Sequence, residues 1–154
     1  MNELLEKNLI CELKARYFRG LDTKDWALFA DTLTDDVQGR YSDGQLSFDG
    51  KQPLVDFMQE NLSVATVITM HHGHHPEITI NEDGVSAAGV WYLQDMVIDL
   101  QGKTRLYGAA IYRDEYRKVD GQWLINFTGY SRTFEFVEPL SDQHVVLQTM
   151  FGDA

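Results

Sequence analysis

The chain has 154 residues, a hydrophobic fraction of 44%, three prolines and a formal net charge of −11. This length is enough to bury a core with a pocket, and the composition argues against disorder. The acidic charge, with no basic run to offset it, disfavours nucleic acid and anionic membranes as partners.

The amino-terminal segment mixes charged residues among apolar ones and lacks the continuous apolar region of a secretory signal. No run of about 18 apolar residues is available to span a membrane. The lone cysteine, Cys11, cannot form an internal disulfide and is expected to pack as a small apolar group. We therefore predict a single soluble, cytoplasmic domain over residues 1–154.

The first part of the chain has the periodicity of helices. Apolar side chains recur about every four residues between residue 2 and Gly20, which predicts one amphipathic helix with Tyr17 on its inward face. Gly20 is expected to end this helix. A second helix should follow, with Asp22 or Thr23 as its N-cap and Asp25 in its first turn.

A short hairpin is predicted over residues 37–48, around the turn Ser42-Asp43-Gly44. A third helix should begin within residues 50–53, because Pro53 suits the first turn of a helix. Its apolar face carries Leu54, Phe57, Met58 and Leu62.

The pattern then changes to long strands separated by turn signals. Four strands are predicted in meander order, over residues 64–80, 85–100, 104–118 and 123–136. Strands this long would aggregate if they were flat, so we expect a strongly curved sheet around the helices. The predicted fold is an α+β cone, with three N-terminal helices packed in a strongly curved, mostly antiparallel sheet that encloses a cavity.

The first of these strands contains four of the five histidines, within residues 71–75. Such a cluster suggests proton transfer, metal binding or solvent-facing polarity. His72 is expected to point away from the cavity, and His74 and His75 to be solvated. Metal binding through His72 and His74 is the alternative, but no carboxylate or second histidine motif follows at the spacing of metal-binding cupins. No metal is therefore expected.

Strand pairing suggests a partner for His71. If Ile80 pairs with Val85, an antiparallel ladder places His71 opposite Gln94, and one bulge would place it opposite Asp95. Gly73 and Pro76 are residues that accompany bulges. A carboxylate hydrogen-bonded to an imidazole fixes its tautomer and stabilises the imidazolium, which makes a general base plausible. A purely structural histidine–aspartate pair is the alternative.

The element order and several segments resemble the SnoaL-like family of the nuclear-transport-factor-like, cone-fold superfamily. The chain is similar to scytalone dehydratase and bile-acid 7α-dehydratase in its order of tyrosine, aspartate, histidine, aspartate and arginine. The segments that carry this resemblance are Arg16-Tyr17, Asp22-Thr23-Lys24-Asp25-Trp26, Thr69-Met70-His71-His72, Gly89-Val90-Trp91-Tyr92 with Asp95, and Tyr112-Arg113-Asp114-Glu115-Tyr116 with Asp120-Gly121-Gln122-Trp123.

The resemblance implies that four residues, Tyr17, Asp22, His71 and Asp95, are catalytic and line the cavity. Arg132 would be a cavity arginine that holds a substrate oxygen or neutralises a carboxylate, although strand alternation does not decide which sheet face it occupies. On sequence alone, a helix cap is the more natural role for Asp22. The aromatic side chains expected to contact a ring-containing substrate are Tyr41, Trp91 and Tyr130.

We therefore expect a lyase (dehydratase) or isomerase that needs no cofactor and acts on a small, largely apolar cyclic carbonyl compound, such as a polyketide- or steroid-like ring. His71 would abstract a proton, Asp95 would orient it and Tyr17 would polarise the carbonyl. A non-catalytic domain that binds a small molecule or a partner chain, and the small subunit of a ring-hydroxylating oxygenase, are alternatives. The outer sheet face is expected to pack in a homodimer or larger homo-oligomer.

Overall fold

The computed structural model describes residues 2–152; residues 1 and 153–154 of the expected domain lie outside the described residues. The helices in this range are α1 (Glu3–Asp22), α2 (Trp26–Ala30) and α3 (Lys51–Leu62). The strands are β1 (Leu33–Tyr41), β2 (Leu46–Asp49), β3 (Val67–Ile80), β4 (Ser86–Asp99), β5 (Thr104–Val119) and β6 (Gln122–Pro139).

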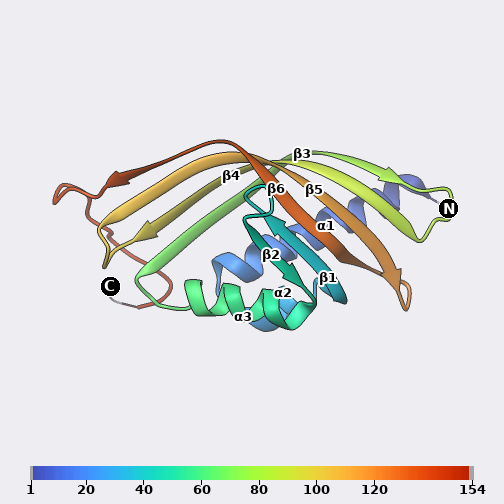
Figure 1. Cartoon of the computed structure of the whole chain (residues 1–154), viewed down its shortest axis with the longest axis horizontal. Helices are drawn as coiled ribbons and strands as arrows, with labels where there is room; N and C mark the ends of the chain where they lie inside the picture. The colour runs from blue at the N-terminus through green and yellow to red at the C-terminus, as the bar shows by residue number, and fades with distance from the viewer. Residues whose placement is uncertain (1, 153–154) are drawn as a thin grey trace.

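All the strands form a single sheet, in the order β2-β1-β6-β5-β4-β3. Neighbouring strands are antiparallel except β1 and β6, which are parallel. The four long strands β3–β6 bend into an arch, and the helices lie on its inner side (Figure 1). This arrangement confirms the expected α+β cone fold. The sheet curves because long strands twist, and the curved sheet wraps around the helices.

The connection between α1 and α2 differs from the expectation. Gly20 lies inside the last turn of α1, where a Cβ would approach the backbone nitrogen of Phe29 to 2.8 Å, so the glycine permits close packing of α2. Thr23 is the C-cap of α1, and Asp25 caps α2 by accepting a hydrogen bond from the Leu28 nitrogen at 2.9 Å. The expectation that Asp22 or Thr23 caps the second helix is therefore wrong.

A bulge in β3 sets the register with β4. Ile80 pairs with Ala87 rather than Val85, and the register shifts between His74 and Glu77, where His75 has a φ of +46°. Beyond this shift, His71 lies opposite Asp95. A bulge and the pairing of His71 with Asp95 are both present, but the predicted register of the turn is wrong. Counting from the observed Ile80–Ala87 pair alone would place His71 opposite Met96, and the extra residue in β3 moves it opposite Asp95.

The core lies between the inner face of the sheet and the helices. On β3, Ile78 is buried in this core, while His72 is exposed on the other face. Tyr17 is fully buried on α1, as the helical periodicity predicts. Within residues 2–152, no helix combines the length and apolar character needed to cross a membrane.

Candidate functional site

A cavity of about 140 Å³ lies between the inner face of the sheet and the helices. Its polar lining combines an imidazole, an ion pair and phenols, from His71, Asp95, Arg132, Tyr17, Tyr41, Tyr112 and Tyr130. The remaining lining is apolar and comes from Leu21, Leu46, Phe57, Met58, Leu62, Leu93 and Val97. Polar groups that converge on an otherwise apolar cavity are typical of a small-molecule site.

Asp22 holds the His71 side chain in place. Its Oδ1 lies 2.6 Å from His71 Nδ1, and its Oδ2 accepts a hydrogen bond from the His71 backbone nitrogen at 2.9 Å. Thr69 Oγ1 donates to Asp22 Oδ1 at 2.8 Å. The carboxylate is available for these contacts because Asp22 ends α1 beside β3 instead of capping α2.

These contacts also determine the charge of Asp22. Burial raises the pKa of the Asp22 carboxyl, but the hydrogen bonds from the His71 ring and backbone and from Thr69, together with the His71 charge, outweigh that effect. The pKa therefore lies below its usual value, and the carboxylate is ionised at neutral pH. An ionised carboxylate only accepts hydrogen bonds, so Nδ1 of His71 carries the proton and Nε2 is the basic nitrogen.

The imidazole is also fixed by an aromatic neighbour. The His71 ring stacks on Phe18 with a centroid separation of 6.1 Å and an interplanar angle of 5°. Gly73 makes room for the Phe18 ring, since a Cβ at Gly73 would lie 2.5 Å from Phe18 Cε2. Asp22 and His71 also border an open groove between α1 and β3, so the pair is reachable from solvent as well as from the cavity.

Asp95 does not contact the imidazole as expected. It forms a two-pronged ion pair with Arg132, with distances of 2.5 Å from Nη1 to Oδ1 and 2.8 Å from Nη2 to Oδ2. The expectation that Asp95 orients His71 is therefore wrong, although the two residues are neighbours across the strands. The sheet places Asp95 opposite His71 by backbone pairing, but the Asp22 side chain reaches the ring from α1.

Arg132 occupies the inner face of the sheet and lines the cavity. Of the roles left open by the sequence, neutralisation of Asp95 is the one that the structure shows. Burial lowers the pKa of Arg132, but the hydrogen bonds and charge of Asp95 outweigh it and raise the pKa above the usual value. The guanidinium therefore stays charged, with its planar fork held by the carboxylate.

The phenols of Tyr17 and Tyr41 contact each other in the cavity wall, with 2.7 Å between their oxygens. Burial raises the pKa of both groups, so both remain neutral and able to donate hydrogen bonds. Tyr130 lines the same cavity, and its hydroxyl accepts from Ser42 Oγ at 3.4 Å. These tyrosines provide a donor-rich wall.

Trp91 is the expected substrate-contacting residue that the structure does not bring to the cavity. Its indole nitrogen donates to the Tyr116 hydroxyl at 2.8 Å, and it is absent from the described residues that line the cavity. It belongs to the hydrophobic core. Within residues 2–152, no group of three histidine, cysteine, aspartate or glutamate side chains is arranged to hold a metal ion.

Sequence reasoning missed a buried charge pair behind the cavity. Lys14 Nζ lies 2.7 Å from Asp114 Oδ2, and both side chains are 0% exposed. The sequence carried a signal for both. Lys14 lies three residues before Tyr17 on the inward face of the helix. Asp114 lies two residues from each of the buried residues Tyr112 and Tyr116, so it shares their face of the strand.

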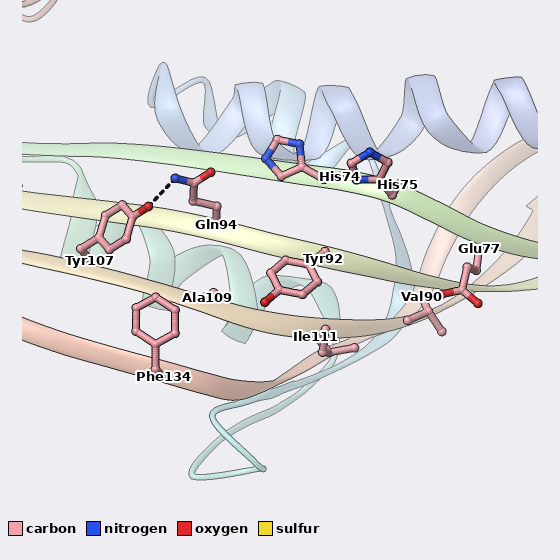
Figure 2. A pocket seen from close by; sticks show the side chains of 10 residues that line it. All are labelled: His74, His75, Glu77, Val90, Tyr92, Gln94, Tyr107, Ala109, Ile111 and Phe134. Atoms are coloured by element: carbon pink, nitrogen blue, oxygen red, sulfur yellow. Dashed lines mark hydrogen bonds between the residues drawn. The ribbon is translucent and has the colours of Figure 1, made fainter.

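The outer face of the sheet carries a separate hollow of about 610 Å³. Side chains from β3, β4, β5 and β6 surround it, and Gln94 donates to the Tyr107 hydroxyl across it (Figure 2). Its other lining residues are His74, His75, Glu77, Val90, Tyr92, Ala109, Ile111 and Phe134. Two histidines of the cluster thus lie on the face opposite His71.

Several solved structures share this fold. A hexachlorocyclohexane dehydrochlorinase from Novosphingobium barchaimii is 19% identical, with a TM-score of 0.78 and coverage of 94% of this chain and 96% of that chain. A protein from Novosphingobium aromaticivorans whose name proposes a scytalone dehydratase is 20% identical, with a TM-score of 0.79 and coverage of 99% and 97%. ActVI-ORFA of Streptomyces coelicolor is 18% identical, with a TM-score of 0.69 and coverage of 82% and 96%.

Sequence comparison agrees with the fold. The family model of the SnoaL-like domain matches residues 2–128, which include α1, α2, α3 and the strands as far as β5. The match also includes His71, Asp22 and Asp95. The chain therefore belongs to the SnoaL-like domain family, within the nuclear-transport-factor-like cone fold.

Proposed function

We propose that this protein is a lyase or isomerase that needs no cofactor and acts on a small cyclic carbonyl compound in the inner cavity. The observation that carries the proposal is the His71–Asp22 pair, in which a fixed imidazole lines a largely apolar cavity. His71 is the general base in this proposal. Asp22, rather than Asp95, is the group that orients it.

The proton chemistry follows from the hydrogen bonds of the pair. Asp22 accepts from Nδ1, which leaves Nε2 of His71 with a free lone pair for a substrate proton. When the ring takes that proton, the adjacent carboxylate stabilises the imidazolium. A base arranged in this way removes a proton from the carbon next to a carbonyl group, which begins either an elimination or an isomerisation.

The phenols of the cavity wall supply the second part of the reaction. Removal of that proton places negative charge on the carbonyl oxygen. Tyr17 and Tyr41 share one hydrogen bond, so one of the two neutral phenols donates to the other and the accepting phenol, Tyr17 in this proposal, keeps its own proton for that oxygen. In a dehydration the proton held by His71 is available to a departing hydroxyl group. Arg132 is neutralised by Asp95, so the cavity is suited to a neutral substrate rather than an anionic one.

Cavity size limits the substrate. An apolar cavity of about 150 Å³ accommodates a benzene-sized molecule, and this cavity has about 140 Å³. The enclosed part of the substrate is therefore one six-membered ring with small substituents. A larger polyketide- or steroid-like compound would place its further rings outside the cavity.

The activities for which two structural neighbours are named support the reaction class. Dehydrochlorination and dehydration both remove a hydrogen and a leaving group from neighbouring atoms. The sequence identities of 19% and 20% establish only a shared fold, so fold-level analogy is all that they contribute. The reaction assignment depends on the side chains of this chain.

The test is a screen of monocyclic β-hydroxy-ketones for loss of water, followed by absorbance of the conjugated ketone. We expect His71→Gln to lower kcat by about 10²–10⁴-fold, the usual contribution of a general base. His72→Gln is the matched control, because it changes the neighbouring histidine on the outer face, and its kcat should stay within about twofold of the wild type. Equal turnover by His71→Gln and wild type would remove the assignment of the base.

A binding function without catalysis is the second candidate, and one observation favours it. The polar groups of the cavity contact one another, in the pairs His71–Asp22, Asp95–Arg132 and Tyr17–Tyr41. A site that only binds an apolar ring needs no free polar group. This candidate predicts a ring compound that binds wild type and His71→Gln equally and is recovered unchanged from both.

We also propose that the outer hollow is covered by a second copy of the chain. Tyr92 and Phe134 are each 48% exposed there, which is unusual for large aromatic side chains. The chain as a whole is strongly acidic, yet the hollow is lined by a single carboxylate, Glu77, beside His74 and His75. Repulsion between two acidic copies is least at such a face, and a two-fold contact can place histidines near the glutamate of the other copy.

A further inference from the structure

The buried lysine of α1 has no role in the reaction described so far. Lys14 Nζ lies 2.7 Å from Asp114 Oδ2, but the contact lacks hydrogen-bond geometry. Burial lowers the pKa of Lys14, and the Asp114 carboxylate opposes this effect by its charge and proximity. A lysine with no exposure is costly to keep, so its surroundings should explain why the chain retains it.

Those surroundings are aromatic rings. Lys14 Nζ lies 3.8 Å from the ring centroid of Tyr112, 4.3 Å from that of Tyr17 and 4.9 Å from that of Phe18. A charged ammonium is attracted to ring faces at such distances, whereas a neutral amine gains little. Tyr17 and Tyr112 line the cavity on the other side, and Phe18 stacks on His71.

A second group holds the same oxygen of Asp114 that Lys14 contacts. The Tyr116 hydroxyl donates to Asp114 Oδ2 at 2.9 Å and accepts from the Trp91 indole nitrogen at 2.8 Å. The ion pair is therefore oriented, with its positive end toward the rings of the cavity wall and its negative end toward Tyr116. An apolar pair of similar size is often as stable as a buried ion pair, so stability alone does not account for it.

We propose that Lys14 is a positioning residue whose charge, applied through the rings of Tyr17 and Tyr112, makes their phenols stronger hydrogen-bond donors toward an oxygen in the cavity. The catalytic consequence rests on the function proposed above, in which Tyr17 donates to the developing oxyanion. The electrostatic effect itself does not depend on any substrate. It can therefore be tested separately from turnover.

The charge of Lys14 is measurable in the wild-type protein. The ¹⁵N chemical shift of a lysine Nζ distinguishes an ammonium from a neutral amine. With ¹⁵N-labelled lysine, Lys14 should give an ammonium signal at pH 7, assigned by its loss in Lys14→Met. A neutral amine at pH 7 would overturn the proposal, and this measurement needs only the wild type and the assignment variant.

The effect on the phenol is measured with a fluorinated tyrosine at position 17. Fluorination makes the phenol more acidic and brings its titration into the range in which the protein stays folded. We expect Lys14→Met to raise the pKa of the residue at position 17 by about one unit or more, since a cation next to the ring favours the phenolate. Lys7→Met, which removes a lysine that pairs with Glu3 near the start of the same helix, should leave that pKa unchanged.

A second variant covers the case in which Lys14→Met leaves Asp114 unpaired and unfolds the protein. The double variant Lys14→Met/Asp114→Asn removes both charges, and the pKa at position 17 should again rise, because the positive end of the pair lies nearer the ring. An unchanged or lowered pKa would overturn the proposal. If neither variant folds, the Nζ signal of the wild type decides, assigned in that case through the contacts of the Lys14 side chain with the ring protons of Tyr112. An unaffected rate in His71→Gln would contradict the proposed base, but it would not change the interpretation of the Nζ signal or of the pKa at position 17.

Discussion

At the scale of single residues, the role of each polar side chain in the site depends on which group it pairs with. His71 has Asp95 opposite it in the sheet, yet its ring contacts Asp22. Asp95 in turn is engaged by Arg132 on β6. A carboxylate can stabilise an imidazolium only if it is not already neutralised by a closer cation, and this assigns the orienting role to Asp22.

Double-mutant cycles test which of the two carboxylates, Asp22 or Asp95, pairs with His71. For the free energy of unfolding at pH 7, the cycle of His71→Ala with Asp22→Asn should give a coupling of about 1 kcal/mol or more, since the two side chains share a hydrogen bond. The cycle of His71→Ala with Asp95→Asn should give less than about 0.5 kcal/mol. Urea denaturation of the variants measures both. A larger coupling to Asp95 would reverse the assignment.

The lowered pKa of Asp22 predicts how stability depends on pH. A carboxyl group whose pKa is lower in the folded than in the unfolded state stabilises the fold above its unfolded pKa, near 3.8 here, and this contribution is lost as the pH falls through the folded pKa. Asp22→Asn should therefore lower the free energy of unfolding by about 1–2 kcal/mol at pH 6. The deficit should shrink by pH 3.

Denaturant unfolding of wild type and Asp22→Asn at both pH values measures this difference. Asp31→Asn is the control, since it removes an exposed carboxylate outside the site. A deficit that stays constant between pH 6 and pH 3 would show that Asp22 stabilises the fold by packing and not by its charge.

At the scale of elements, the packing of α1 on β3 places the imidazole. The carboxyl end of α1 brings Asp22 to the edge strand, and Phe18, one turn earlier, supports the ring of His71. Gly73 is what allows this approach, because any side chain there meets the Phe18 ring. The position of the base thus depends on a residue that carries no functional group.

Gly73→Ala tests this dependence. The added Cβ forces Phe18 away from β3, and we expect a loss of about 1–3 kcal/mol in the free energy of unfolding, as for other overpacked sites. Phe18→Leu removes the ring atoms that the Cβ would meet, so Gly73→Ala should cost less in a Phe18→Leu background than in the wild type. Thermal or urea unfolding of the four proteins measures the difference, and equal costs in both backgrounds would contradict the packing argument.

At the scale of the whole molecule, the two faces of the sheet have different environments. The inner face is covered by the helices and holds the cavity, while the outer face exposes aromatic side chains around the larger hollow (Figure 2). A second copy packed on that face would remove the aromatic surface from water. It would also leave the inner cavity of each copy separate.

Charge placed in the outer hollow should therefore separate the copies. Phe134→Glu adds a second carboxylate to a hollow that contains only Glu77, and we expect the mass measured by light scattering after size-exclusion chromatography to fall to that of one chain, 17.7 kDa. Leu147→Glu is the matched control, since it adds the same charge at a side chain that is 93% exposed in the C-terminal segment. A monomeric wild type, or an unchanged mass for Phe134→Glu, would contradict the proposed interface.

The sequence by itself determined the element order, the cone fold, the inward face of the first helix and the presence of a bulge in the histidine strand. These depend on local periodicity and turn residues, which short stretches of chain encode. Only the tertiary structure decided which carboxylate contacts the imidazole, because Asp22 and His71 are 49 residues apart and meet through the docking of α1 on β3. The bulge at His75 was equally decisive, since strict alternation from the buried Ile78 would turn His72 and His74 inward, and one extra residue turns His71 inward instead. The tertiary structure also decided the Lys14–Asp114 pair, because the two residues lie on α1 and β5 and meet only when the helix packs on the sheet. The rings around Lys14 are likewise brought together by this packing.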